Sequence, residues 1–467
     1  MASPQSNSGD TPSSTSSFDS SLSSLTDPQI PGASGLSILW RLRDQLVAEI
    51  EEQIPASSAK RVIEECISTF FTQSFQVLPI CHEPSIRESA GCFFGSAKAG
   101  ELTPVNHGHG QLRREDTRDQ VKLMRSFTLL TALCASMSFV HSNSFIPHGS
   151  QVGPLFLCAS RGMLKVYMDY DIQHPDCSSL QIRMLYSSSF HHYAGHNALG
   201  SHSVSEACLL ARRLRLFTEA ALSHVDPLEA TMLRLSWWSL YIADQSGICT
   251  RERAVTLYQP FFDAVMDIRI SSPEDEPLLG TTQNHREVGL EASLRASLHV
   301  VIRICASAAE LLLTIRSFTH ISSASNPMDD TPPTQVAKIA QMYAEYDALA
   351  GEIPPERATD RDTPTTSSPE SYYILRRLRA QVVYHGFKLM IIHECAEKKT
   401  PRAIGCDGNP ECIDRAVANA AYDFIQALNA VPFHHVQTLG EPVVRPFPMN
   451  MDDHITNTSR RRRKSHG

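Results

Sequence analysis

The sequence lacks any pair of cysteines with the spacing of a zinc site. It holds 12 cysteines, yet no two are separated by two residues, so a site built on a C-x-x-C pair is excluded. Positive charge is also scarce, because 42 lysines and arginines stand against 50 aspartates and glutamates. The net charge of -8 disfavours a nucleic-acid surface spread over the whole chain, and contact with DNA would need a local basic patch.

Long apolar runs are missing as well. The nearest candidate, Phe127 to Val140, is interrupted by Thr, Ser and Cys and is too short to span a bilayer. At the N-terminus no basic region precedes an apolar stretch, so no secretory signal is visible. We therefore expect no membrane partner, an intracellular protein and reduced cysteines.

Motifs of catalysis are absent from the sequence. It has no Gly-rich phosphate loop, no G-x-S-x-G elbow and no kinase signature, and strands do not alternate with helices. His192 and His196 have the spacing of two metal ligands on one helix turn, but no glutamate completes H-E-x-x-H, so packing or capping roles are expected. We predict no catalytic residue, metal or cofactor. An active site assembled from distant residues would leave no motif, which keeps an enzyme as an alternative.

What the sequence does contain is helical periodicity over most of its length. Leu39, Leu42, Leu46 and Ile50 fall on one helical face, and similar patterns recur up to Leu428. We predict an all-α fold with a helical domain over residues 35–447, interrupted by polar loops such as 98–120 and 271–286. The group Arg376, Arg377 and Arg379 is interpreted as a solvated helix face.

The two ends of the chain differ from this pattern. Residues 1–34 form a Ser/Thr-rich leader that is predicted to be disordered. Its acidic and hydrophobic residues have a spacing that activation segments use, but a plain flexible leader is the favoured interpretation. Residues 448–467 form a second disordered segment with a run of five cations, which suits a nuclear-import receptor. The import candidates are Arg460, Arg461, Arg462, Arg463 and Lys464.

Residues 203–250 contain the strongest local signals. Ser203 with Glu206 predicts a capping box, and Asp226 followed by Pro227 predicts the start of a second helix. Asp244 is placed near the end of that helix. Its aromatic residues allow two interpretations, an effector pocket or plain core packing, and core packing is favoured. These residues are Trp237, Trp238 and Tyr241.

This stretch resembles the middle regulatory region of fungal binuclear zinc-cluster transcription factors. The resemblance lies in the order ARRLRLFTEA, DPLEA and WWSLYIADQS, although Gln245 stands where that family usually has arginine. Two further segments follow the same order along the chain. One is the paired aromatics with Pro79, Ile80, His82 and Pro84. The other is similar to quinate- and xylan-type regulators, with Pro432, Phe433, Gln437, Gly440, Glu441 and Pro442.

The resemblance implies a transcription regulator in a fungal nucleus that controls a metabolic or secondary-metabolite gene cluster. Because six clustered cysteines are absent, we expect the protein to reach DNA only indirectly, through a DNA-binding zinc-cluster protein or the transcription machinery. The alternative is that an upstream exon encodes the missing zinc cluster. A small-molecule inducer and a dimeric state are both compatible with this resemblance. The alternatives from other classes are a helical small-molecule-binding protein or enzyme of unknown chemistry, and a structural adaptor.

Overall fold

The computed structural model describes residues 33–95, 112–141, 146, 148–193, 196–251, 254–280, 286–322, 333–354, 369–406 and 410–431. This part of the chain is built from twelve α-helices and no β-strand, so the predicted all-α fold is confirmed. Most of the predicted leader and all of the tail, including Arg460 to Lys464, lie outside the described residues, as does the segment Pro432 to Pro442.

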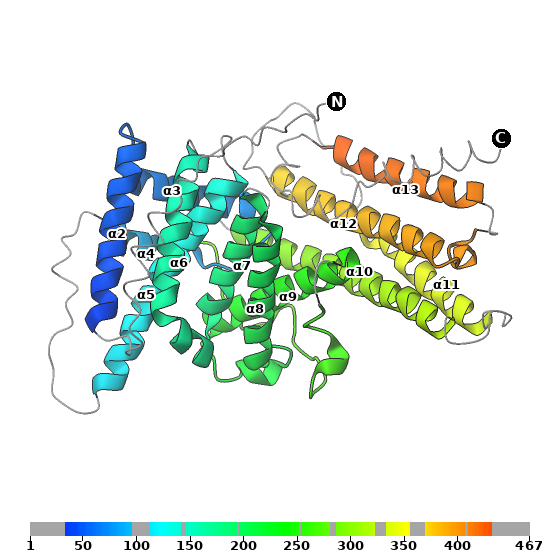
Figure 1. Ribbon diagram of the computed structural model, residues 1–467, viewed down its shortest axis with the longest axis horizontal. Coiled ribbons are helices and arrows are strands. Elements are labelled where there is room, and N and C mark those ends of the chain that lie inside the picture. The colour runs from blue at the N-terminus through cyan, green and yellow to red at the C-terminus, as the bar shows by residue number, and fades with distance from the viewer. Residues whose placement is uncertain are drawn as a thin grey trace, which may run out of the picture.

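The first half of the chain forms a bundle that occupies one end of the molecule (Figure 1). Its helices are α2 (Ala33–Gln53), α3 (Ala59–Thr69), α4 (Glu83–Phe94), α5 (Leu112–Val140), α6 (Gly149–Gln173), α7 (Cys177–His192), α8 (Asn197–Arg213) and α9 (Pro227–Thr250), with a π-helical turn at Phe70–Ser74. The long helix α5 packs against α6 and α7 and contacts α2, α3 and α4. It therefore lies at the centre of this bundle.

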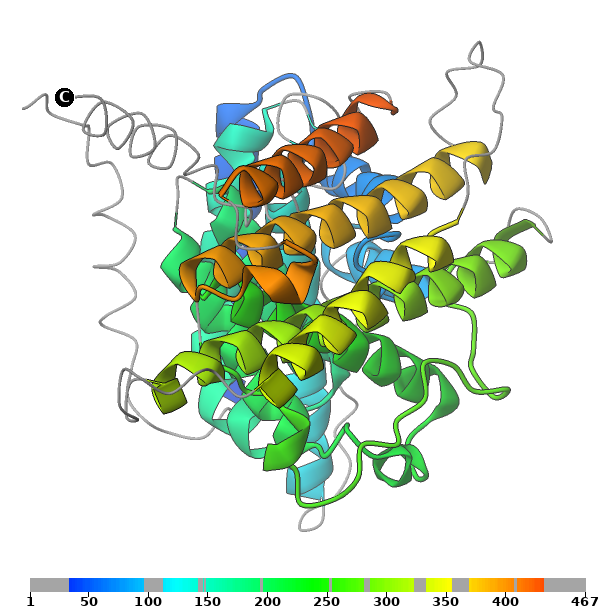
Figure 2. The same ribbon diagram turned by 90° about the vertical axis from the view of Figure 1, so that its right-hand side faces the viewer.

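The second half forms a group of long helices at the other end. These are α10 (Arg286–Ser322), α11 (Pro333–Ala348), α12 (Pro369–Glu397) and α13 (Pro410–Asn429), with short 3-10 turns at Gln259–Phe261, Leu349–Glu352 and Pro401–Ile404. Figure 2 shows their axes side by side, with α13 outermost against α12. Helix α10 also packs against α9 and so joins the two halves. One connected hydrophobic core extends from Leu39 in α2 to Ala403 after α12.

Several helix starts follow from local sequence. The side chain of Asp226 accepts the main-chain N–H groups of Leu228 and Glu229 at 3.2 and 3.5 Å, and Pro227 is the first helical residue of α9, as predicted. The predicted face of α2 is also confirmed, because Leu39, Leu42, Leu46 and Ile50 are all buried. Ser58 caps α3 by accepting the N–H of Arg61.

Other local predictions were wrong. Ser203 does not begin a helix, because α8 starts six residues earlier and the Ser203 hydroxyl donates to the carbonyl of Leu199 within it. Helix α5 begins at Leu112, inside the segment predicted as a loop. Helix α9 continues six residues beyond Asp244. In α9 three of the residues after Asp244, namely Gln245, Ile248 and Cys249, are buried, so tertiary packing extends this helix past the point where a polar residue suggested its end.

Two helices are long and apolar enough to cross a membrane by length and composition alone. They are Arg118–Val140 within α5 and Glu291–Ser317 within α10. The apolar window of the first is 78% buried inside the fold and that of the second 56% buried. Their apolar residues thus pack largely against neighbouring helices, as the central positions of α5 and α10 require.

Candidate functional site

The segment between α9 and α10 returns along α9 in an extended path. We call residues 254–280 the strap. Near the end of α9, Asp244 accepts the N–H of Leu257 at 2.8 Å, and further back the indole N–H of Trp238 donates to the carbonyl of Arg269 at 3.0 Å. At the start of α9, Arg234 donates to Asp275 at 2.7 Å. The strap therefore runs antiparallel to α9 and contacts it over most of its length.

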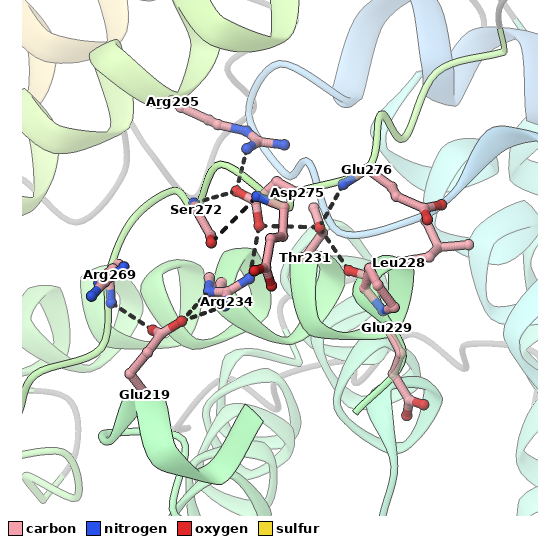
Figure 3. A network of polar contacts seen from close by, with 12 residues as sticks. Glu219, Leu228, Glu229, Thr231, Arg234, Arg269, Ser272, Asp275, Glu276 and Arg295 are labelled. Atoms are coloured by element: carbon pink, nitrogen blue, oxygen red, sulfur yellow. Dashed lines mark hydrogen bonds and ion pairs between the residues drawn. The ribbon is translucent and has the colours of Figure 1, made fainter. Parts of the chain in front are cut away.

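Asp275 is the central acceptor where the strap meets α9 and α10 (Figure 3). Its carboxylate accepts hydrogen bonds from Arg234, from Arg295 of α10, from the N–H of Ser272 at 2.8 Å and from the hydroxyl of Thr231 at 3.2 Å. The Asp275 side chain is only 3% exposed. Two cations and two neutral donors balance the cost of burying this charge.

A second carboxylate binds Arg234 from the opposite side. Glu219 accepts Nε of Arg234 at 3.0 Å and the N–H of Arg269 at 3.1 Å. Burial disfavours the charged form of Glu219, but the hydrogen bonds from Arg234 and Arg269 outweigh it and lower the pKa of this carboxyl. Arg234 is thus enclosed by carboxylates from two segments and forms a structural link between them.

Glu291 fixes the end of the strap to α10. One oxygen of its carboxylate accepts the N–H groups of Leu278 and Leu279 at 2.9 and 2.8 Å. Burial raises the pKa of Glu291 above its usual value, although these two hydrogen bonds oppose the shift. The N–H of Glu83 donates to the carbonyl of Leu278 at 2.8 Å, so the start of α4 lies against the same strap end.

A pocket of about 530 Å³ lies between the strap and α10. This volume is within the range of small-molecule sites. Arg295 and His299 are one helical turn apart on α10 and present polar groups, while small and apolar side chains form much of the wall. The lining residues are Ile270, Ser271, Asp275, Pro277, Glu291, Ala292, Arg295, Ala296 and His299. The acidic stretch of the strap was visible in the sequence, but its partners on α10 were not.

The aromatic residues singled out in the sequence lie beside this pocket without lining it. Trp237 is 0% exposed and packs against Phe217 and Phe262, and Trp238 is buried with its ring edge-to-face to Tyr241. Tyr241 is partly buried, and burial raises its pKa to about 12. Trp238 instead donates to the strap main chain at Arg269, the residue before the pocket residue Ile270.

His192 and His196, whose spacing would suit two metal ligands on one helix turn, do not share a helix. Helix α7 ends at His192, and His196 is the N-cap residue of α8. Nδ1 of His192 donates to the carbonyl of Ser188 at 2.8 Å, which caps the end of α7. His82 contacts the Ser85 hydroxyl at 2.8 Å, and burial lowers its pKa. In the described parts of the chain no three His, Cys, Asp or Glu side chains are grouped as metal ligands.

Comparison with known proteins gave no match to any family model, curated protein or solved structure. The candidate site therefore stands on its geometry alone: a strap bound by carboxylates along an aromatic helix, with a pocket where the strap meets α10.

Proposed function

We propose that this protein is a transcription regulator of a fungal nucleus that controls a metabolic or secondary-metabolite gene cluster. Because the sequence holds no C-x-x-C pair from which a zinc cluster could be built, DNA is reached either through a partner protein or through a zinc cluster that an upstream exon encodes. The helical domain is the regulatory part.

The observation that carries this proposal is the meeting of two segments that resemble zinc-cluster regulators. The amide of Gln181 on α7 donates to the carbonyl of Ile80 and lies 3.4 Å from the sulfur of Met232 on α9. Ile80 belongs to the Pro-Ile-x-His-x-Pro segment and Met232 to the tryptophan-bearing helix, about 150 residues later. The two segments follow each other along the chain in the same order as in zinc-cluster regulators, and in this fold they pack in one core. This supports the proposal that the helical domain and the regulatory region of that family have a common origin.

The proposal is tested by deleting the gene in its host and sequencing transcripts. Altered transcript levels across a linked set of genes are expected, and restoring the full chain should reverse them. Accumulation of a single metabolite with unchanged transcripts would contradict the proposal and favour an enzyme.

The partner requirement has its own test. The purified full chain is expected to leave promoter DNA of the affected genes unbound at physiological salt, whereas chromatin immunoprecipitation of the tagged chain from cells should recover that DNA. Sequence-specific binding by the purified chain alone would overturn the indirect mechanism.

A second candidate function is small-molecule binding without a role in transcription. The pocket of about 530 Å³ beside Arg295 and His299 favours it, because a cavity of this size accommodates a metabolite. Deletion would then change the level or the fate of that metabolite and leave the linked transcripts unchanged.

A further inference from the structure

Two arginines of α12, Arg376 and Arg379, donate to neutral groups of other segments. Arg379 donates from Nη1 to the carbonyl of Val77 at 2.9 Å, and Arg376 donates to the hydroxyl of Ser293 on α10. Both side chains are partly buried, and both acceptors are neutral. Within the described ranges, no carboxylate lies at ion-pair distance from Arg376 or Arg379. Their interpretation as part of a solvated helix face was therefore wrong.

The most deeply buried arginines of the described chain are satisfied differently. Arg125 and Arg183 both contact the carboxylate of Asp171, at 2.6 and 2.7 Å, and Arg234 contacts Asp275 at 2.7 Å. A guanidinium that leaves water normally needs such an anion, because burying an uncompensated charge is strongly unfavourable. Among the described residues, no carboxylate gives Arg376 and Arg379 this compensation.

The missing anion has two physical consequences. Burial lowers the pKa of Arg379 to about 10 and lowers that of Arg376, whereas the carboxylates around Arg125 raise its pKa. In addition, Nε of Arg376 is buried and has no hydrogen-bond acceptor among the described residues. The unmet demand is therefore for an acceptor that also carries negative charge.

We propose that Arg376 and Arg379 bind the phosphate group of a small molecule between α12, α10 and the segment at Val77. The two residues are three positions apart, so they project from neighbouring points on one side of the helix. A phosphate carries a charge of about -1.5 to -2 at pH 7, which matches two guanidinium groups, whereas one carboxylate would neutralise only one. Arginine donors also fit phosphate oxygens in a fork geometry.

This inference is independent of the proposed function, because it follows from burial and charge at α12 alone. The ligand would join three parts of the chain, since the neutral acceptors of the two arginines are Val77 before α4 and Ser293 on α10. A ligand that binds only the folded chain raises the free energy of unfolding in proportion to the logarithm of its concentration. Binding and stability should therefore change together.

The test uses the full chain and inorganic phosphate at constant ionic strength. The thermal midpoint is expected to rise with phosphate concentration, and calorimetric titration should give a saturable isotherm. Arg376→Gln, the less buried position, should weaken phosphate binding at least tenfold. Arg376→Lys retains the charge without the fork and should give an intermediate loss. Arg415→Gln removes an exposed arginine of α13 and serves as the matched control with unchanged binding.

Further ligands identify the source of the phosphate group. Tighter binding of glycerol 3-phosphate than of inorganic phosphate would assign the site to a phosphate ester, and the reverse order to free phosphate. Acetate binding as tight as phosphate binding would overturn the proposal. So would the absence of a phosphate-dependent midpoint shift, or an equal shift in the wild-type chain and in Arg376→Gln.

Discussion

Arg234 and Arg295 come from different helices, and both donate to the carboxylate of Asp275 on the strap. This relationship makes one strap residue the common partner of α9 and α10. Since α10 is also the helix that joins the two halves of the fold, this buried carboxylate binds the strap to both helices at that junction.

Replacing Asp275 by alanine should therefore be strongly destabilising. It leaves Arg295 without its closest anion and Arg234 with Glu219 alone, and breaking a buried ion pair in this way costs about 3 kcal/mol. Urea unfolding of the full chain measures the loss. Asp263→Ala, which breaks the exposed pair with Arg215, is the control and should change stability by about 0.5 kcal/mol or less. Equal losses in the two variants would contradict the role given to Asp275.

Trp237→Ala tests whether this tryptophan is a core residue. Because its ring is fully buried against Phe217 and Phe262, truncation should lower the free energy of unfolding by about 4 kcal/mol. Phe261→Ala, at an exposed aromatic residue of the strap, should change it by about 0.5 kcal/mol or less. A Trp237 variant of near-native stability would speak against the packing described above.

Gly200 is required by a close approach between α7 and α8. A Cβ at this position would lie 2.4 Å from Cε1 of His191, whose ring donates to the carbonyl of Ser187. Gly200→Ala should therefore destabilise the fold by about 1–3 kcal/mol. At Gly91 in α4 a Cβ meets nothing within 4 Å, so Gly91→Ala should stabilise by about 0.5–1 kcal/mol. Denaturant unfolding should give a lower free energy of unfolding for Gly200→Ala than for the wild type, and a higher one for Gly91→Ala.

His141 should make stability depend on pH between about 6.5 and 4. Burial, with His192 nearby, lowers its pKa to about 4, so below pH 6.5 the unfolded chain takes up a proton that the folded chain does not. The contribution of His141 to the free energy of unfolding is fully present above pH 6.5 and decreases as the pH falls. At pH 5 the free energy of unfolding is about 2 kcal/mol lower from this group than above pH 6.5. His141→Gln retains a partner for the Ser74 hydroxyl. Urea unfolding at pH 7.5 and 5.0 should show a smaller loss for the variant than for the wild type.

The basic run near the C-terminus is predicted to direct nuclear import. Alanine at Arg460, Arg461, Arg462, Arg463 and Lys464 should move a fluorescent fusion from the nucleus to the cytosol, because an import receptor recognises clustered cations. Replacing the four arginines by lysine retains the charge and should preserve import. A distribution that is mainly cytosolic already in the unaltered chain would count against the nuclear assignment.

The sequence predicted the elements whose causes are local. Asp226 and Pro227 begin a helix through their own hydrogen bonding and backbone geometry, and the leucines of α2 reveal a buried face by their spacing alone. Ser203 failed because the same hydroxyl that can cap a helix can also donate to a carbonyl one turn back within it. The difference between the two is decided by where α8 packs, not by the residues around Ser203.

The candidate site was harder to predict because its contacts are distant in sequence. Asp244 is placed by the N–H groups of the strap, and Asp275 by arginines of two helices, and neither partner is visible in a local pattern. The arginines of α12 illustrate the same limit. Their basic character suggested a solvated face, whereas contacts with Val77 and Ser293 leave Arg379 and Arg376 partly buried.

The contact between Val77 and Arg379 also has a consequence for synthesis of the chain. The two residues are 302 positions apart, and Val77 packs on the small cluster that α12 forms with α13. At a translation rate of about 5–20 residues per second, the segment at Val77 waits on the order of tens of seconds for its partners. During this time its apolar side chains face water or a chaperone. The nascent bundle of the first half must therefore persist with one face uncovered until α12 is complete.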